Sequence, residues 1–227
     1  VLDPYRLVFL DLQYIGRRVD QASLVDAACR SKARGFFLSA GMGETCGFVS
    51  NQHSYTMQHK REQKETGGSQ EDMAVNFPPF SECLTTELKK LESTNKKSTD
   101  ESVVNFVCLL QFLKSNPGSS DAAAFAKYAQ DQLNVAGFSA LAKGYDFAGF
   151  FDKTLREPLI LGASVVGGYL SQEAVKVITM QHRPLENVVV YNPVMSTVFV
   201  QRHPPVPPKT GGVMYEGAAF EELSDDD

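Results

Sequence analysis

The chain has 227 residues, 43% of them hydrophobic and 22% charged, with a formal net charge of −5 at pH 7. This length suits one sizeable domain or two small ones, and the composition is that of a globular protein. The sequence lacks the roughly 18 consecutive uncharged apolar residues of a membrane span, and its first residues lack the order of a signal peptide. We therefore expect a soluble intracellular protein that binds no membrane. Because a strand-like run follows Val1 almost at once, we also expect the chain to begin within a larger fold.

The first 58 residues predict part of a doubly wound sheet. Residues 5–12 are β-branched and aromatic enough for a buried strand, residues 18–32 have an apolar helical face, and residues 35–40 read as the next strand. Strand, helix and strand at this spacing predict a parallel crossover. A glycine-containing turn then lets residues 47–50 return antiparallel. We assign residues 1–58 to the second half of a Rossmann-like α/β sheet.

The middle of the chain changes character twice. Residues 59–76 are polar, charged and contain glycine, which predicts a flexible loop. Residues 77–158 predict an inserted helical region, with helices over 100–114 and 121–133, each preceded by aspartate or serine residues that can cap it. The aromatic run at 145–151 favours buried packing over a partner surface.

A helix with a small-residue side, followed by a closing β-hairpin, is predicted at residues 159–201. Bulky apolar residues recur along it at helical spacing, whereas Ala163, Gly167 and Ser171 fall four apart on one side. Gly167 and Gly168 each cost roughly 1 kcal/mol relative to alanine in a helix interior. The pair therefore predicts close packing against another backbone or a phosphate-sized group, although a plain buried helix also fits the pattern.

The sequence assigns no catalytic, metal-binding or cofactor-binding residue. The four cysteines, Cys29, Cys46, Cys83 and Cys108, include no C-x-x-C pair, and the histidines complete no zinc ligand set. No G-x-G-x-x-G turn is present. Asp11 stands out among the carboxylates only because it ends a buried strand, where α/β sheets collect ligands. We expect reduced, mostly buried thiols.

Acidic residues gather at the C-terminal end. From 204 to 227 the chain carries one basic residue, Lys209, and six acidic ones, and the rest of the chain is balanced. Residues 202–227 therefore predict a Pro-rich and then acidic tail that stays solvated. Without a basic field, the chain is not expected to bind nucleic acid.

The order of these features resembles the C-terminal part of the non-catalytic, Aos-type adenylation subunit of heterodimeric SUMO-activating enzymes. The resemblance is carried by VVGGYLSQEAVKVI at 165–178, by the turn QHRPLEN, and by the strand VVVY at 188–191. Upstream, GFFLSAGMGETCGFVSN at 35–51 matches the family's strand, turn and returning strand. The resemblance implies a ThiF/MoeB-type adenylation fold, of which this chain supplies the second half.

The resemblance also implies a function shared between two chains. A catalytic partner subunit binds ATP and magnesium, adenylates the C-terminus of the ubiquitin-like modifier, and takes it as a thioester. This chain completes the heterodimer in the nucleus and cytoplasm without a cofactor of its own. The expected partner interface is the small-residue side of the helix, with Ala163, Gly167, Gly168, Ser171 and Gln172.

Two alternatives remain open at this point. One is a partner subunit for another ubiquitin-like modifier or for ubiquitin itself, although the short 59–76 segment favours the SUMO-type subunit. The other is a self-sufficient α/β enzyme that uses a nucleotide, which the missing glycine-rich turn disfavours.

Overall fold

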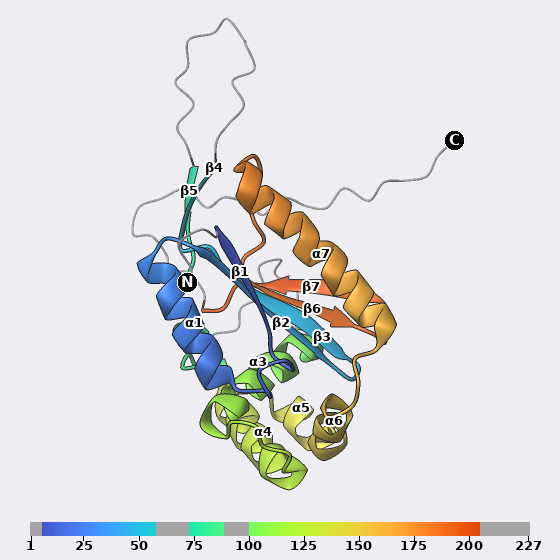
Figure 1. Cartoon of the computed structure of the whole chain (residues 1–227). Coiled ribbons are helices and arrows are strands. Elements are labelled where there is room, and N and C mark those ends of the chain that lie inside the picture. The colour runs from blue at the N-terminus through green and yellow to red at the C-terminus, as the bar shows by residue number, and fades with distance from the viewer. Residues whose placement is uncertain (1–5, 58–72, 89–99, 205–227) are drawn as a thin grey trace, which may run out of the picture.

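The computed structural model describes residues 6–57, 73–88 and 100–204, which form an α/β fold around a mixed sheet of five strands (Figure 1). The strand order is β1-β2-β3-β6-β7. The sheet comprises β1 (Leu7–Asp11), β2 (Gly35–Met42), β3 (Thr45–Asn51), β6 (Val188–Asn192) and β7 (Thr197–Gln201). Segments at the two ends of the described chain therefore share one sheet.

The predicted crossover is confirmed. β1 pairs with β2 in parallel, and α1 (Val19–Ser31) connects them. β2 then pairs antiparallel with β3 through a turn at Gly43, whose φ is +57°. A Cβ atom at Gly43 would lie 2.0 Å from the carbonyl oxygen of Lys153. Both the backbone conformation and this close approach require glycine at the turn.

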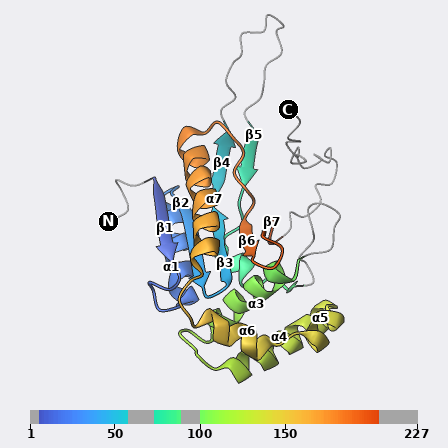
Figure 2. The same ribbon diagram turned by 90° about the vertical axis from the view of Figure 1, so that its right-hand side faces the viewer.

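Alternate residues of β2 point to opposite faces of the sheet, as strand geometry dictates. Phe36 and Leu38 enter the larger core with α1 and the helical region, whereas Phe37 lies in a smaller core on the opposite face. The smaller core is covered by α7 (Ile160–Thr179), and Figure 2 shows this helix lying along the sheet. β6 and β7 form the predicted closing hairpin.

The helical region contains α2 (Phe80–Cys83), α3 (Glu101–Ser115), α4 (Ala122–Ala136), α5 (Ser139–Gly144) and α6 (Phe147–Thr154). The last three gather beyond one end of the sheet, as Figures 1 and 2 show. Asp100 and Asp121 cap α3 and α4 by accepting backbone N–H bonds, which confirms the predicted helix starts. Phe147 and Phe151 are fully buried, so the aromatic run fills the core as predicted.

Part of the predicted loop at residues 59–76 is a strand, which corrects that prediction. β5 (Met73–Asn76) pairs antiparallel with β4 (Ser54–Met57). Val75 packs with Tyr55 and Phe77 in a small separate core, and this burial outweighs the polar composition of the preceding residues. Residues 59–72 of the predicted loop and residues 205–227 of the predicted tail lie outside the described residues.

The helix α3 is more deeply buried than its sequence pattern predicts. Each residue from Val103 to Leu113 is buried, including the polar Asn105 and Gln111. Gln111 donates to the carbonyl oxygens of Cys83 and Thr86. Within the described ranges, no helix is long and apolar enough to cross a membrane.

Candidate functional site

The helix α7 is anchored to the sheet by one side only. Gly162, Val166 and Glu173 are its buried residues, and they follow one another along the same side of the helix. Val166 packs with Phe37, Phe48 and other residues of the smaller core. α7 contacts β2, β3 and β6 with this side, and the residues on its opposite side are mostly exposed.

The close approach of α7 to the sheet occurs at Gly162, not at the glycine pair. A Cβ atom at Gly162 would lie 2.8 Å from Cys46 Sγ and 3.2 Å from Tyr191 Cδ1. In the part of the chain that the structure describes, nothing outside the backbone of α7 lies within 4 Å of a Cβ built on Gly167 or Gly168. The prediction of close packing at the pair is therefore wrong within the described residues, because Gly167 and Gly168 lie away from the side of α7 that holds Gly162, Val166 and Glu173 against the sheet.

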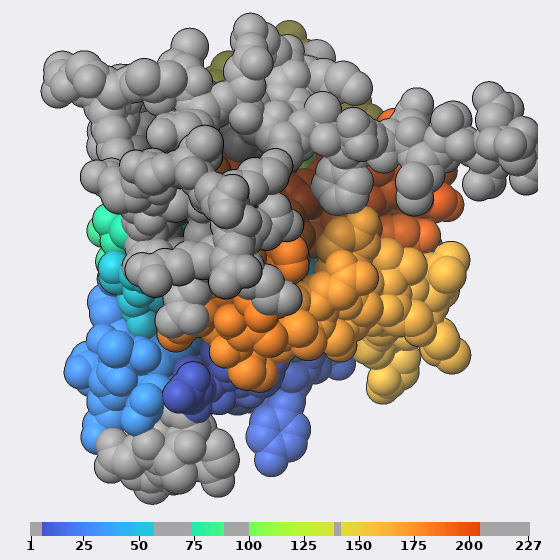
Figure 3. Space-filling model, turned by 90° about the horizontal axis from the view of Figure 1, so that it is seen from above, coloured from blue at the N-terminus to red at the C-terminus, as the bar shows by residue number. Residues whose placement is uncertain are grey.

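The outward side of α7 carries no charge. All 20 residues of the helix are described, and we call the following exposed residues, together with the half-buried Gly167, the uncharged face: Ile160, Leu161, Ala163, Ser164, Gly168, Ser171, Gln172, Val175, Ile178 and Thr179. Ile160 is 82% exposed, Val175 58% and Ile178 53%. In Figure 3 the helix is seen as the gold-to-orange band at the molecular surface. The five residues predicted as a partner interface all belong to this face.

The two charged residues of α7 neutralise each other beside the sheet. Glu173 is 1% exposed and accepts hydrogen bonds from Lys176 Nζ and from the backbone N–H of Leu185, both at 2.6 Å. Surface helices normally direct charged residues to the solvent. Here the charged groups lie toward the core while Ile160, Val175 and Ile178 face outward, an arrangement typical of a surface that another protein covers.

Asp11 has a structural role at the end of β1. Its Oδ1 accepts the backbone N–H groups of Gln13 and Tyr14 at 3.0 and 3.1 Å, and its Oδ2 accepts the hydroxyl of Ser39 at 2.9 Å. These bonds hold the turn that leads into α1. A hollow of about 320 Å³ lies beside this turn and reaches Ala163 and Gly167, at the border of the uncharged face.

The cysteines are in environments that suppress their reactivity. All four are buried and unpaired. Burial raises the pKa of Cys83 and of Cys108 to about 12, and it also raises the pKa of Cys29 and Cys46. Nucleophilic cysteines instead have lowered pKa values and partial exposure. The expectation of buried, reduced thiols therefore agrees with the structure.

Cys83, Asn187 and His203 lie together and form a structural network. Cys83 Sγ donates to the backbone carbonyl of His203 at 2.8 Å, and the ring Nε2 of His203 lies 3.1 Å from the carbonyl oxygen of Cys83. Asn187 donates to the carbonyl of His203 and accepts its N–H. The imidazole thus contacts a carbonyl and not the thiol, an arrangement that does not activate a nucleophile. The described residues contain no group of three potential metal ligands.

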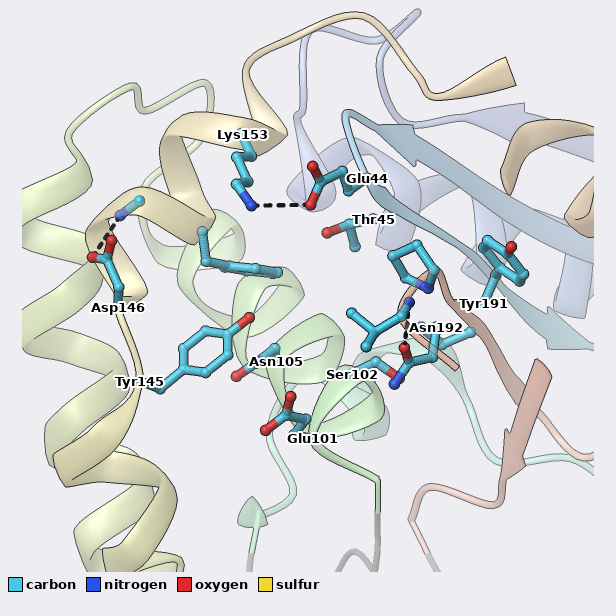
Figure 4. Close-up of a pocket in the computed structure, with 15 residues that line it drawn as sticks. Glu44, Thr45, Glu101, Ser102, Asn105, Tyr145, Asp146, Lys153, Tyr191 and Asn192 are labelled. Carbon is cyan, nitrogen blue, oxygen red and sulfur yellow. Dashed lines mark hydrogen bonds and ion pairs between the residues drawn. The ribbon is translucent and has the colours of Figure 1, made fainter. Parts of the chain in front are cut away.

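A second hollow, which we call the acidic pocket, lies between the helical region and the end of the sheet (Figure 4). It has a volume of about 310 Å³. α3 supplies Glu101, Ser102 and Asn105, and the β2–β3 turn supplies Glu44. Asp146 caps the start of α6 and Lys153 lies in its last turn, and Tyr145 and Asn192 add further polar groups. The sequence analysis missed this pocket. Its one signal was the polar Asn105 inside the apolar run VVNFVCLL.

No protein-family model matches the chain, and no curated protein sequence matches it.

Proposed function

We propose that this chain is the non-catalytic subunit of an activating enzyme for a ubiquitin-like modifier, SUMO in the first instance. In this proposal its sheet is the second half of a ThiF/MoeB-type adenylation fold. The uncharged face of α7 docks on a catalytic subunit, which holds ATP and magnesium and forms the thioester with the modifier. The single observation that carries the proposal is that the outward side of the 20-residue helix α7 has no charged residue.

The physical contribution of such a subunit is to fix the position of its partner. A stable interface buries about 800 Å² on each protein and is depleted of charge at its centre. The outward glycines, with open space above them, allow a partner backbone or side chain to approach α7 closely. A rigid second subunit would then hold the partner's phosphate-binding groups in place before the reaction. Such preorganised groups lower the activation barrier because they need not reorient in the transition state.

The test is to place a charge in the middle of the uncharged face. Among the described residues, a Cβ atom at Gly168 would have no neighbour within 4 Å outside the backbone of the helix itself, so we expect Gly168→Glu to leave the fold of this chain intact. It even replaces a poor helix former with a better one. In complex with the catalytic subunit of a SUMO-activating enzyme, the unpaired buried carboxylate should weaken binding by roughly 30-fold or more, about 2 kcal/mol.

Ala123→Glu provides the matched control, because Ala123 is exposed on α4, away from the uncharged face. Affinity is measured by titration calorimetry, and modifier thioester formation is followed in parallel on non-reducing gels. Equal affinity of Gly168→Glu and the wild type would refute the assignment of this face. Failure of the wild-type chain to bind any activating-enzyme catalytic subunit would refute the proposed function.

A further inference from the structure

The acidic pocket carries more negative charge than its own residues neutralise. Three carboxylates, Glu44, Glu101 and Asp146, line it together with one ammonium, that of Lys153. Lys153 Nζ lies 3.1 Å from Glu44 Oε2, so this cation is already engaged. Burial raises the pKa of Tyr145 to about 12, and the negative charges of Glu101, Glu44 and Asp146 act in the same direction. The pocket therefore favours a cation.

The pocket also contains a buried acceptor that lacks a donor. Asn105 is 1% exposed, and its Oδ1 has no hydrogen-bond partner among the described residues, although its side chain also hydrogen-bonds the hydroxyl of Tyr145 and thereby opposes the rise in the pKa of Tyr145. Figure 4 shows Asn105, Tyr145 and Glu101 on the same side of the pocket. Buried side-chain acceptors are nearly always paired, and one that is not calls for an explanation. An N–H group of a bound ligand would supply the missing donor.

The hollow continues toward the uncharged face of α7. A neighbouring hollow of about 350 Å³ shares Glu44 and Lys153 with the acidic pocket and extends to Leu159 and Ile160. These two residues are 41% and 82% exposed, and Ile160 begins the uncharged face. On the other rim, Val194 is 92% exposed. Apolar side chains at both rims fit a polypeptide better than a free amine, because a polypeptide can cover them.

We propose that the acidic pocket receives a lysine or arginine side chain from the polypeptide that covers the uncharged face of α7. The side chain's N–H groups meet Asn105 Oδ1 and the Glu101 carboxylate, and the segment that carries it runs past Leu159 and Ile160. This inference rests on the proposed function for the identity of the covering polypeptide. The recognition of a basic side chain by the pocket stands on the pocket itself.

The first experiment uses blocked tripeptides on the whole chain labelled with ¹⁵N. Acetyl-Leu-Lys-Leu amide is titrated at millimolar concentration, and the same peptide with norleucine or Nε-acetyl-lysine in place of lysine is the control. The lysine peptide should shift the side-chain amide signals of Asn105 in a saturable way, and the two uncharged peptides should not. Equal shifts with the norleucine peptide, or no shift with lysine and arginine peptides, would overturn the proposal.

Two charge variants distinguish peptide binding in the acidic pocket from nonspecific attraction to the negative charge of the protein. Glu101→Gln should lower the affinity for the lysine peptide roughly two- to five-fold, which corresponds to the loss of one partly exposed ion pair. Asp131→Asn removes the same charge from an exposed position on α4 and should leave the affinity unchanged. An equal loss in both variants would show a nonspecific attraction and count against the pocket.

The last experiment tests whether the catalytic subunit itself occupies the acidic pocket. Addition of the catalytic subunit should displace the lysine peptide, because its own basic side chain takes the same place. A peptide that still binds with unchanged affinity to the assembled heterodimer would overturn the link. This outcome differs from failure of the proposed function, which is read from the binding of the wild-type chain to a catalytic subunit and does not depend on peptide binding.

Discussion

The three glycines of α7 respond in opposite directions to the same substitution. Gly162→Ala places a methyl group 2.8 Å from Cys46 Sγ and 3.2 Å from Cys46 Cβ, both fixed in the smaller core. Overpacking of this kind costs about 1–3 kcal/mol, against a helix-propensity gain of at most about 1 kcal/mol. We expect Gly162→Ala to lower the free energy of unfolding by about 1–2 kcal/mol. Gly167→Ala and Gly168→Ala should raise it by up to about 1 kcal/mol, because open space surrounds both positions.

Urea unfolding of the isolated chain, followed by circular dichroism, measures these changes if the slope of the transition stays constant. Cys46→Ala removes the sulfur that the new methyl group would meet. The double variant Gly162→Ala with Cys46→Ala should therefore lose less stability than the sum of the two single changes. A stabilising Gly162→Ala, or full additivity in the double variant, would refute the assignment of the contact between α7 and the sheet.

Three further measurements follow from buried polar groups. Burial lowers the pKa of His53 and of His203 from the ordinary histidine value of 6.5 to about 4, so between these two values the unfolded chain binds more protons than the folded one. The free energy of unfolding should therefore fall by about 1–2 kcal/mol per histidine from pH 7 to pH 5. Equal urea midpoints at the two pH values would contradict this. Glu173→Gln removes the charge that Lys176 pairs with and should cost about 1–2 kcal/mol in the same urea assay, whereas wild-type stability would argue against a role for this pair. Cys83 and Cys108 should react with a chromogenic disulfide reagent only on unfolding, because they are buried and their pKa values are about 12, and rapid labelling of the native chain would be inconsistent with the structure.

Much of the fold follows from local patterns in the sequence. The strand, helix and strand at the start of the described chain, the capped helices after Asp100 and Asp121, and the closing hairpin all have signals within a few residues of one another. β5 was missed because its reason to be a strand is the distant partner β4, and the burial of Val75 with Tyr55 is a tertiary effect. Composition around Met73 gives no hint of that pairing.

The candidate sites show the same limit. The small-residue side of α7 was visible as a four-residue spacing, but its direction was not. That direction depends on which side packs on the sheet, and Gly162 fits there because Cys46 and Tyr191 lie opposite it. The acidic pocket joins residues 44, 101 and 146, which only the folded chain brings together. A polar residue within an apolar helix, such as Asn105, is the kind of signal that could have indicated it.

The orientation of the uncharged face is fixed by contacts at both ends of α7. Near the start of the helix, Gly162 packs against Cys46, where a Cβ atom would lie 2.8 Å from the sulfur. Near its end, the Tyr55 hydroxyl lies 2.9 Å from the carbonyl oxygens of both Lys176 and His182, and Glu173 holds the N–H of Leu185. A rotation that turned Ile160, Val175 and Ile178 toward the core would break all of these contacts. Specific polar and packing interactions thus hold an uncharged surface with exposed Ile160, Val175 and Ile178 toward the outside. Such an orientation is explained if a second protein covers the surface.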